Sequence, residues 1–427
     1  MSSKEEHMLE ALQLAKNGLL TASPNPMVGC VITHNNEVIG RGWHECSGEN
    51  HAEINAIEDV FSNLGDKSKE ALKESELFVN LEPCTTFGKT PPCADSISEY
   101  GIKKVYFGNE DKAQQGFSKM HPGIKVESGL LEEEGRKLNK GFFSRIEKGR
   151  PYISCKVASA LDGGIALPSR ESKWITSSDS RKDVHKIRAY SDAILTGTGT
   201  IQIDNPQLTS RDSGLDEGSY KQPLRVVVDR NNVLTGKENI FSSGTQTILF
   251  INQDSLLKDK ENVEIAQLRA TPNLPLEEVV RYLAEEKLIN NLMVEAGSGI
   301  INSLLLEKLV DELILYKGPK LLGENRQSFV NLDVAREKLG TIDLEIDDIE
   351  EIEIYSGGTS LGRYSGEYLN CVKERDFSEE KKKLWDRMTG NVNELNDPAN
   401  SNGRVNQYPN AYYQDPDNAT NNYEKRY

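Results

Sequence analysis

Three potential metal ligands in the first quarter of the chain constrain its fold most. His51 begins a His-Ala-Glu motif, and two cysteines, Cys84 and Cys93, each follow a proline. These side chains can act together only if a tertiary fold brings distant segments to one point. One imidazole and two thiolates suit zinc and leave a fourth coordination position for water, which is typical of catalytic rather than structural zinc sites.

A carboxylate, Glu53, lies two residues after the histidine. Zinc lowers the pKa of a water molecule to about 7, and a nearby carboxylate can then carry protons to a ring nitrogen and to departing ammonia. The order His-x-Glu followed by Pro-Cys motifs is typical of zinc deaminases, in which the glutamate is the acid/base and not a ligand. We therefore predict a catalytic zinc site with His51, Cys84 and Cys93 as ligands and Glu53 as proton carrier, with a structural zinc site as the alternative.

The pattern around these residues predicts a layered α/β domain. The residues favour helices at 5–20, 52–61 and 94–100, and strands at 28–33, 38–42, 77–81 and 104–107, with a hairpin turn at 34–36. His51 and Cys93 would each begin a helix, where the partial positive charge of the N-terminus favours thiolate over thiol.

A second α/β pattern begins after the sequence Gly-Arg-Pro at 149–151. It predicts strands at 152–157, 193–195, 224–228, 247–251, 292–294 and 312–316, and helices at 178–190, 276–286 and 300–309. Two glycine turns, 197–200 and 297–299, follow strands and could offer backbone N–H groups to a cofactor phosphate. No Gly-x-Gly-x-x-Gly fingerprint occurs in this half, which disfavours a Rossmann dehydrogenase. The predicted domains are therefore 1–148 and 149–372.

The remaining segment, 373–427, differs in composition. Its last part, 391–427, holds ten asparagines in 37 positions and almost no aliphatic side chains. Such a segment buries too little apolar surface to offset its ordering entropy, so we predict a disordered tail. Five tyrosines within it leave partner binding open as an alternative.

Charge and hydropathy exclude some classes of partner. The net charge of -16 argues against a nucleic-acid backbone as the main partner. No apolar run approaches the ~20 residues that span a bilayer, and the polar N-terminus predicts no signal peptide. We expect a cytoplasmic protein whose six cysteines are free or metal-bound.

The motifs together resemble a known family. In the first half they are PNPMVG at 24–29, GWH at 42–44, HAE at 51–53, EPC at 82–84 and GKTPPC at 88–93; in the second half they are KVASALDG at 156–163, ESKWIT at 171–176, DNPQLTSR at 204–211 and VEAG at 294–297. From about residue 5 to 372 the chain resembles the bifunctional deaminase–reductase family of riboflavin biosynthesis, the RibD family. The resemblance implies a cytidine-deaminase-like domain followed by a dihydrofolate-reductase-like domain, with Zn²⁺ and NADPH as cofactors. It also implies two steps on phosphorylated pyrimidines, namely loss of the 2-amino group as ammonia and reduction of the ribosyl to a ribityl chain, in a homo-oligomer.

The resemblance also assigns roles by position. Deaminase substrate would be held by Asn25, His44 and Lys89. NADPH would contact Ala158, Trp174, Thr200, Asp204 and the turn of Gly297, Ser298 and Gly299. The sugar phosphate and base would be held by Ser172, Arg188, Leu208, Arg211 and Glu295.

Some positions depart from the family pattern. Thr86 stands where the family usually has a histidine, residues 109–112 replace its Asp-Pro-Asn-Pro loop, and Gly164 replaces a basic residue. Thr86 keeps open the possibility of a reductase whose deaminase domain is inactive or acts on another base. Two further classes of protein stay open. One is a nucleic-acid deaminase, which the charge and the second domain disfavour, and the second is a binding protein that keeps zinc for stability.

Overall fold

The computed structural model describes residues 2–330, apart from 89, 115, 170–174, 217, 243, 253–256, 258–259 and 269–274, together with 344–351 and 360–365. The chain divides into two units, residues 1–372 and 373–427, and every described element belongs to the first. The predicted disordered tail lies outside the described residues. No helix in the described part is long and apolar enough to cross a membrane.

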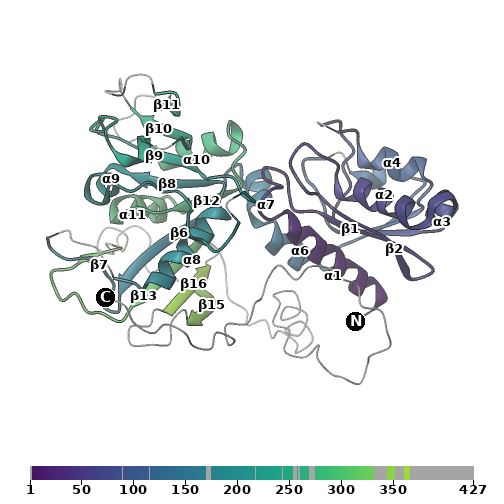
Figure 1. The fold of residues 1–427 in the computed structure, drawn as a ribbon, viewed down its shortest axis with the longest axis horizontal. Coiled ribbons are helices and arrows are strands. Elements are labelled where there is room, and N and C mark those ends of the chain that lie inside the picture. Colours follow the sequence, from purple (N-terminus) through teal and green to yellow (C-terminus); the bar gives the residue numbers. More distant parts are fainter. Residues whose placement is uncertain are drawn as a thin grey trace, which may run out of the picture. The chain divides into compact units, whose positions relative to one another are not determined.

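A five-stranded sheet forms the first half of this unit, in the order β2-β1-β3-β4-β5 (Figure 1). Its strands are β1 (Gly29–His34), β2 (Glu37–Trp43), β3 (Glu76–Leu81), β4 (Lys104–Asn109) and β5 (Lys125–Ser128). β1 pairs antiparallel with β2 and β3, whereas β3, β4 and β5 are parallel. The turn between β1 and β2 has positive φ at Asn35 and Asn36, the conformation that two-residue hairpins prefer.

Helices cover both faces of this sheet, which makes three layers. They are α1 (Ser3–Ala15), α2 (Ala52–Leu64), α3 (Ser68–Lys73), α4 (Cys93–Glu99), α5 (Phe117–Met120), α6 (Glu132–Leu138) and α7 (Lys140–Lys148). A Cβ on Gly29 would lie 2.0 Å from the carbonyl oxygen of Ala11 in α1, and one on Gly42 would lie 2.3 Å from the nitrogen of Ala56 in α2. Side chains alternate between the two faces along a strand, and glycine at both positions lets each helix lie directly against the sheet.

A nine-stranded sheet forms the second half, in the order β11-β10-β9-β8-β12-β6-β13-β16-β15. The strands are β6 (Tyr152–Ala160), β8 (Ala193–Gly197), β9 (Leu224–Val228), β10 (Thr247–Ile251), β11 (Val263–Gln267), β12 (Asn291–Val294), β13 (Glu312–Gly318), β15 (Glu345–Glu351) and β16 (Ser360–Ser365). All run in the same direction except β16, which is antiparallel to both of its neighbours, β13 and β15. A separate two-stranded sheet joins β7 (Gly164–Ala166) to β14 (Gln327–Ser328).

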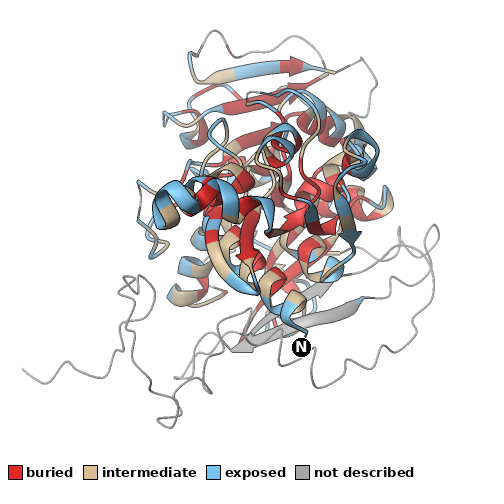
Figure 2. Cartoon of the chain, turned by 90° about the vertical axis from the view of Figure 1, so that its right-hand side faces the viewer, coloured by how far each residue is buried: buried red, intermediate tan, exposed pale blue. Residues whose placement is uncertain are grey.

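Two hydrophobic clusters, one on each face, pack against this second sheet. Figure 2 shows the buried residues mainly on the inner strands and the exposed ones mainly on outer helices and loops. The helices around it are α8 (Ser178–Ala189), α9 (Thr198–Asp204), α10 (Leu276–Glu285) and α11 (Ser298–Leu306). Leu195 belongs to the cluster that contains α10 and α11, and its neighbour Ile194 belongs to the one that contains Val184 of α8. Apolar residues at both positions are expected for a parallel strand that is buried on both faces.

The helices and strands predicted from the sequence are present, with small differences at their ends. The first helix ends at Ala15 and continues as a 3-10 turn over Lys16–Gly18, short of the predicted end at residue 20. Strands β5 and β11 were not predicted, because most of their side chains are exposed and show no apolar run.

Candidate functional site

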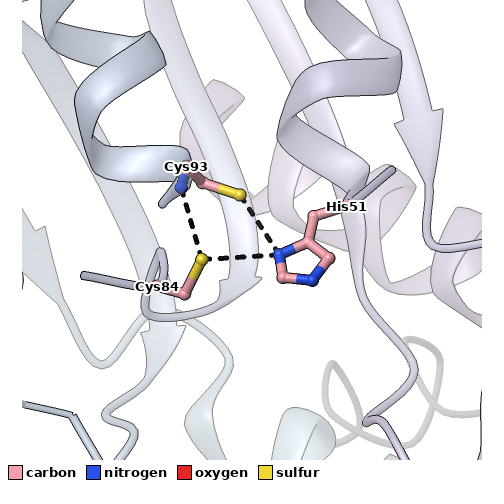
Figure 3. Close-up of side chains that lie close together, drawn as sticks. All are labelled: His51, Cys84 and Cys93. Carbon is pink, nitrogen blue, oxygen red and sulfur yellow. Dashed lines mark hydrogen bonds between the residues drawn. The ribbon is translucent and has the colours of Figure 1, made fainter. Parts of the chain in front are cut away.

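The three predicted zinc ligands come from separate segments and converge (Figure 3). His51 directly precedes α2, Cys84 lies in the loop after β3, and Cys93 begins α4. His51 Nδ1 lies 3.4 Å from Cys84 Sγ and 3.3 Å from Cys93 Sγ. In a tetrahedral zinc site with ordinary bond lengths, nitrogen and sulfur ligands lie about 3.6 Å apart. The donor set and its spacing therefore fit zinc.

Secondary contacts orient these ligands. His51 Nε2 lies 3.4 Å from Thr90 Oγ1, so the hydroxyl can accept its proton and leave Nδ1 as the metal-facing atom. The backbone N–H of Cys93 donates to Cys84 Sγ at 3.3 Å. The hydrogen bond with the Cys93 side chain, assisted by those from His51 and from this N–H, lowers the pKa of the Cys84 thiol to about 4. A thiolate ligand therefore forms readily at neutral pH.

Glu53 lies in the first turn of α2 with only 3% of its surface exposed. Burial raises the pKa of its carboxyl group, and the charge on Cys84 raises it further. A carboxyl group with a raised pKa accepts a proton more readily than an exposed one, which suits a proton carrier.

The substrate residues assigned by resemblance lie beside this centre. Asn25 Nδ2 lies 3.0 Å from His44 Nε2, and His44 Nδ1 lies 3.0 Å from the carbonyl oxygen of Asn50. The His44 ring packs edge-on against the His51 ring, with 5.3 Å between their centroids. Burial lowers the pKa of His44, so its imidazole is neutral at pH 7. Lys89, the third assigned residue, lies outside the described residues.

Gln114 is a residue of this site that the sequence did not reveal. Its Oε1 accepts from the backbone N–H of Thr85 at 3.2 Å and from the hydroxyl of Thr86 at 3.1 Å. It therefore joins the loop after Cys84 to the loop after β4, which are two of the three places where the chain departs from the family pattern.

A second group of predicted residues lies at the carboxyl ends of the parallel strands. Ala158 is near the end of β6, Thr200 and Asp204 lie in α9 after β8, and the 297–299 turn joins β12 to α11. A Cβ on Gly199, Gly297 or Gly299 would meet no atom within 4 Å. This open space lets a ligand approach the backbone at the helix N-termini, so these turns fit the phosphates of a dinucleotide. Ser172 and Trp174 lie outside the described residues.

Charged residues gather beside this edge. Arg188 Nε donates to Glu295 Oε1 at 2.5 Å and its Nη2 donates to Oε2 at 3.0 Å, while Lys156 Nζ lies 3.5 Å from Oε2. Burial alone would raise the pKa of Glu295, but the charges of Arg188 and Lys156 lower it to about 2. Glu295 is therefore ionised at neutral pH and holds both cations in place.

The assigned residues Leu208 and Arg211 lie in the loop beside that ion pair. Leu208 is buried, and Arg211 is exposed, with its Nη1 donating to Thr209 Oγ1 at 3.1 Å. His185, which was not predicted, lies 3.4 Å from Arg188 and accepts the Arg211 N–H at 3.3 Å. Burial, with the charges of both arginines, lowers the pKa of His185 to about 4. The guanidinium of Arg211 is the more available anion ligand, because Arg188 is engaged by Glu295.

Comparison with known families agrees with this two-part architecture. Residues 1–109 match the cytidine and deoxycytidylate deaminase zinc-binding region, and residues 151–353 match the RibD C-terminal domain. The fold and the matched regions together define an enzyme with a zinc deaminase domain and a reductase domain.

Individual relatives narrow this class. The riboflavin biosynthesis protein RibD of Escherichia coli (strain K12) is 38% identical over 342 residues, covering 77% of this chain and 91% of that protein. That of Buchnera aphidicola subsp. Baizongia pistaciae is 38% identical over 334 residues, covering 74% and 87%. The structure of RibD from Acinetobacter baumannii (form 2) superposes with a TM-score of 0.74 at 30% identity over 85% of this chain and 98% of that chain. The chain belongs to the RibD family of riboflavin biosynthesis proteins.

The comparisons confirm the predicted fold class, the family resemblance and the assignment as a bifunctional enzyme that uses zinc and NADPH. They give no support to the alternative of a reductase alone. The roles of single residues and the domain limits are not tested by these matches and stay predictions.

Proposed function

We propose that this enzyme catalyses two consecutive steps of riboflavin synthesis. The first is hydrolytic deamination of 2,5-diamino-6-ribosylamino-4(3H)-pyrimidinone 5′-phosphate, and the second is NADPH-dependent reduction of the ribosyl group of its product. A solved protein from Thermotoga maritima, 34% identical over 85% of this chain with a TM-score of 0.72, is titled a diaminohydroxyphosphoribosylaminopyrimidine deaminase/5-amino-6-(5-phosphoribosylamino)uracil reductase. The observation that carries the proposal is the convergence of His51, Cys84 and Cys93 beside the buried Glu53.

In the first step, His51, Cys84 and Cys93 would hold zinc, which would supply an acidified water molecule. Glu53 would carry one proton of the attacking water to the ring nitrogen, and then carry the second, from the hydroxyl group added to the ring, to the amino group that leaves as ammonia. Asn25 and Lys89 bind the substrate, and His44 fixes the Asn25 carboxamide through the 3.0 Å contact.

In the second step, the 297–299 turn with Thr200, Asp204, Ala158 and Trp174 would hold NADPH, which would supply the hydride for C1′ of the ribose. Glu295 holds Lys156 and Arg188 beside the carboxyl edge of the sheet, and Arg211 with Ser172 and Leu208 binds the sugar phosphate. Arginine suits that task because its guanidinium fork matches phosphate oxygens.

We also propose the domain limits 1–148, 149–372 and 373–427, a cytoplasmic location and a homo-oligomeric state. The two matched family regions fall within the first two ranges. Light scattering on the purified full chain tests the oligomeric state, and a mass equal to that of the monomer would contradict that part of the proposal.

The deamination step is tested without NADPH. Zinc-loaded protein is given the diaminopyrimidine substrate, and ammonia is measured for the wild type, for Glu53→Gln and for Glu58→Gln. Glu58 is the matched control because it lies on the same helix but is exposed. Stoichiometric ammonia from the wild type and from Glu58→Gln, with a loss of at least about 10²-fold for Glu53→Gln, supports the proposal. No ammonia from the wild type, with NADPH oxidation when the deaminated compound is supplied, would leave only the reductase.

A further inference from the structure

The segment that carries Asn25 is bonded to the second sheet. The carbonyl oxygen of Pro24 accepts from Asn290 Nδ2 at 2.9 Å and from Arg145 Nη2 at 3.4 Å. Arg145 Nε in turn donates to Asn290 Oδ1 at 2.7 Å. Both the nitrogen and the oxygen of the Asn290 carboxamide are therefore hydrogen-bonded, and only 3% of the residue is exposed.

A second contact holds the preceding residue. The hydroxyl of Ser23 donates to Asp192 Oδ1. The other oxygen, Asp192 Oδ2, accepts from the backbone N–H groups of Asn290 at 2.9 Å and Asn291 at 2.8 Å. Burial raises the pKa of Asp192, and the hydrogen bonds from Ser23 and these N–H groups offset part of that rise. The carboxylate therefore ties Ser23 to the residue that also holds Pro24.

Asp192 and Asn290, which contact Ser23 and Pro24, both lie at the amino edge of the nine-stranded sheet. Asp192 directly precedes β8 and Asn290 directly precedes β12. The predicted reductase residues Thr200 and Glu295 follow the carboxyl ends of the same two strands. A strand of four or five residues spans about 15 Å, so we expect a change at the amino edge to leave the geometry around Thr200 and Glu295 intact.

The other end of the segment reaches the zinc ligands. His44 Nδ1 faces the Asn50 carbonyl oxygen, which only accepts, so this nitrogen carries the proton. Nε2 of the neutral ring then accepts from Asn25 Nδ2. The same ring packs against the ring of His51. A continuous set of contacts therefore joins the amino edge of the second sheet to the deaminase site.

We propose that Asn290 and Asp192 are positioning residues for deamination: from the amino edge of the reductase sheet they hold Ser23 and Pro24, and so keep Asn25 in place beside the zinc ligands. This inference rests on the proposed deaminase function. Under this proposal, residues of the nine-stranded sheet help to hold the substrate-binding segment of the deaminase site.

The test compares Asn290→Ala and Ser23→Ala with the wild type in the full-length, zinc-loaded chain. Each variant removes one or two hydrogen bonds, so we expect the KM for the diaminopyrimidine to rise about three- to tenfold with kcat changed less than about twofold. Ser23→Thr keeps the hydroxyl and should restore the wild-type KM. Reduction of the deaminated compound by NADPH should keep its KM and kcat in every variant.

Ser191→Ala is the matched control. It makes the same substitution next to Asp192, but the Ser191 hydroxyl donates back to the end of the preceding helix α8, to the Ile187 carbonyl oxygen at 2.9 Å, and not to the 22–28 segment. A role confined to folding would lower the active fraction, and so the kcat of both reactions, and would leave KM unchanged. That pattern, or an unchanged KM in both Asn290→Ala and Ser23→Ala, would overturn the proposal.

Hydrogen exchange of residues 22–28 supplies a readout that needs no activity. Faster exchange there in Asn290→Ala and Ser23→Ala, but not in Ser191→Ala, supports the proposal, and equal rates contradict it. If the wild type itself releases no ammonia, the proposed deaminase function has failed, and these exchange rates alone decide whether the second sheet holds the segment.

Discussion

His51 illustrates, at the scale of single residues, how a neighbour selects the ligand atom of a metal site. Its Nδ1 faces both cysteine sulfur atoms, while Nε2 lies 3.4 Å from the Thr90 hydroxyl. An imidazole whose second nitrogen is bonded keeps one tautomer and one ring orientation, and loss of such a partner typically costs 10- to 100-fold in metal affinity.

We therefore expect Thr90→Val to weaken zinc binding by about 10- to 100-fold without unfolding the domain. Valine keeps the shape of threonine but cannot accept the Nε2 proton. Competition with a chelator measures the affinity. Thr86→Val is the control, because the Thr86 hydroxyl contacts Gln114 and no zinc ligand. Equal zinc affinity in the Thr90 variant and the wild type would show that the contact does not orient His51.

His185 predicts a pH dependence of stability. Its pKa is lowered to about 4 in the folded protein, chiefly by burial and by the charge of Arg188. The unfolded chain takes up a proton on this residue near pH 6.5, whereas the folded chain does not. The free energy of unfolding should therefore fall as the pH drops from 6.5 to 4.

In His185→Gln this part of the pH dependence should disappear. Because solvent screens a half-exposed residue, we expect the free energy of unfolding lost between pH 6.5 and 4 to be smaller in this variant than in the wild type by about 1 kcal/mol. Urea unfolding at pH 7 and pH 4.5 measures it. A variant that loses as much stability as the wild type between these pH values would refute the assignment.

At the scale of elements, strands buried on both faces were the easiest to predict. The observed bounds of β9 and β10 equal the predicted ones, because Leu224–Val228 and Thr247–Ile251 are rich in apolar and β-branched residues and lie between polar turns. β5 was missed because its side chains are largely exposed and give no such signal.

The zinc ligands could be predicted from the sequence because few residue types bind zinc. Gln114 and Asn290 could not, since their hydrogen bonds join segments 28 and 266 residues apart without a sequence pattern.

Gly299, in the first turn of α11, allows a test of where NADPH binds. A Cβ on Gly299 would meet no protein atom within 4 Å, so we expect Gly299→Val to leave stability unchanged but to fill space that would hold NADPH. We expect at least about a tenfold rise in the KM for NADPH and unchanged ammonia release. Gly244→Val is the matched control, since Gly244 is equally open and lies at a turn before β10. An unchanged KM for NADPH in Gly299→Val would place the cofactor elsewhere.

At the scale of the whole molecule, the segment after residue 372 contributes none of the predicted site residues. Residues 1–372 form one compact unit that contains every site residue the structure describes. We therefore expect a chain that ends at Val372 to keep both activities within about twofold, since a segment of this composition cannot add much buried apolar surface. Ammonia release and NADPH oxidation by the shortened protein test this. A loss of either activity would assign the segment a catalytic or structural role.

The hydrogen bonds at the amino edge of β8 and β12 limit how freely the parts of this enzyme can be recombined. A chimera that joined residues 1–148 to an unrelated reductase would keep the zinc ligands and Glu53 but lose the Asn290 carboxamide and the Asp192 carboxylate that meet Pro24 and Ser23. Fusions of the deaminase half should therefore be designed around these two side chains, by grafting their equivalents onto the new partner or by replacing the Ser23–Pro24 segment with one that holds its shape unaided.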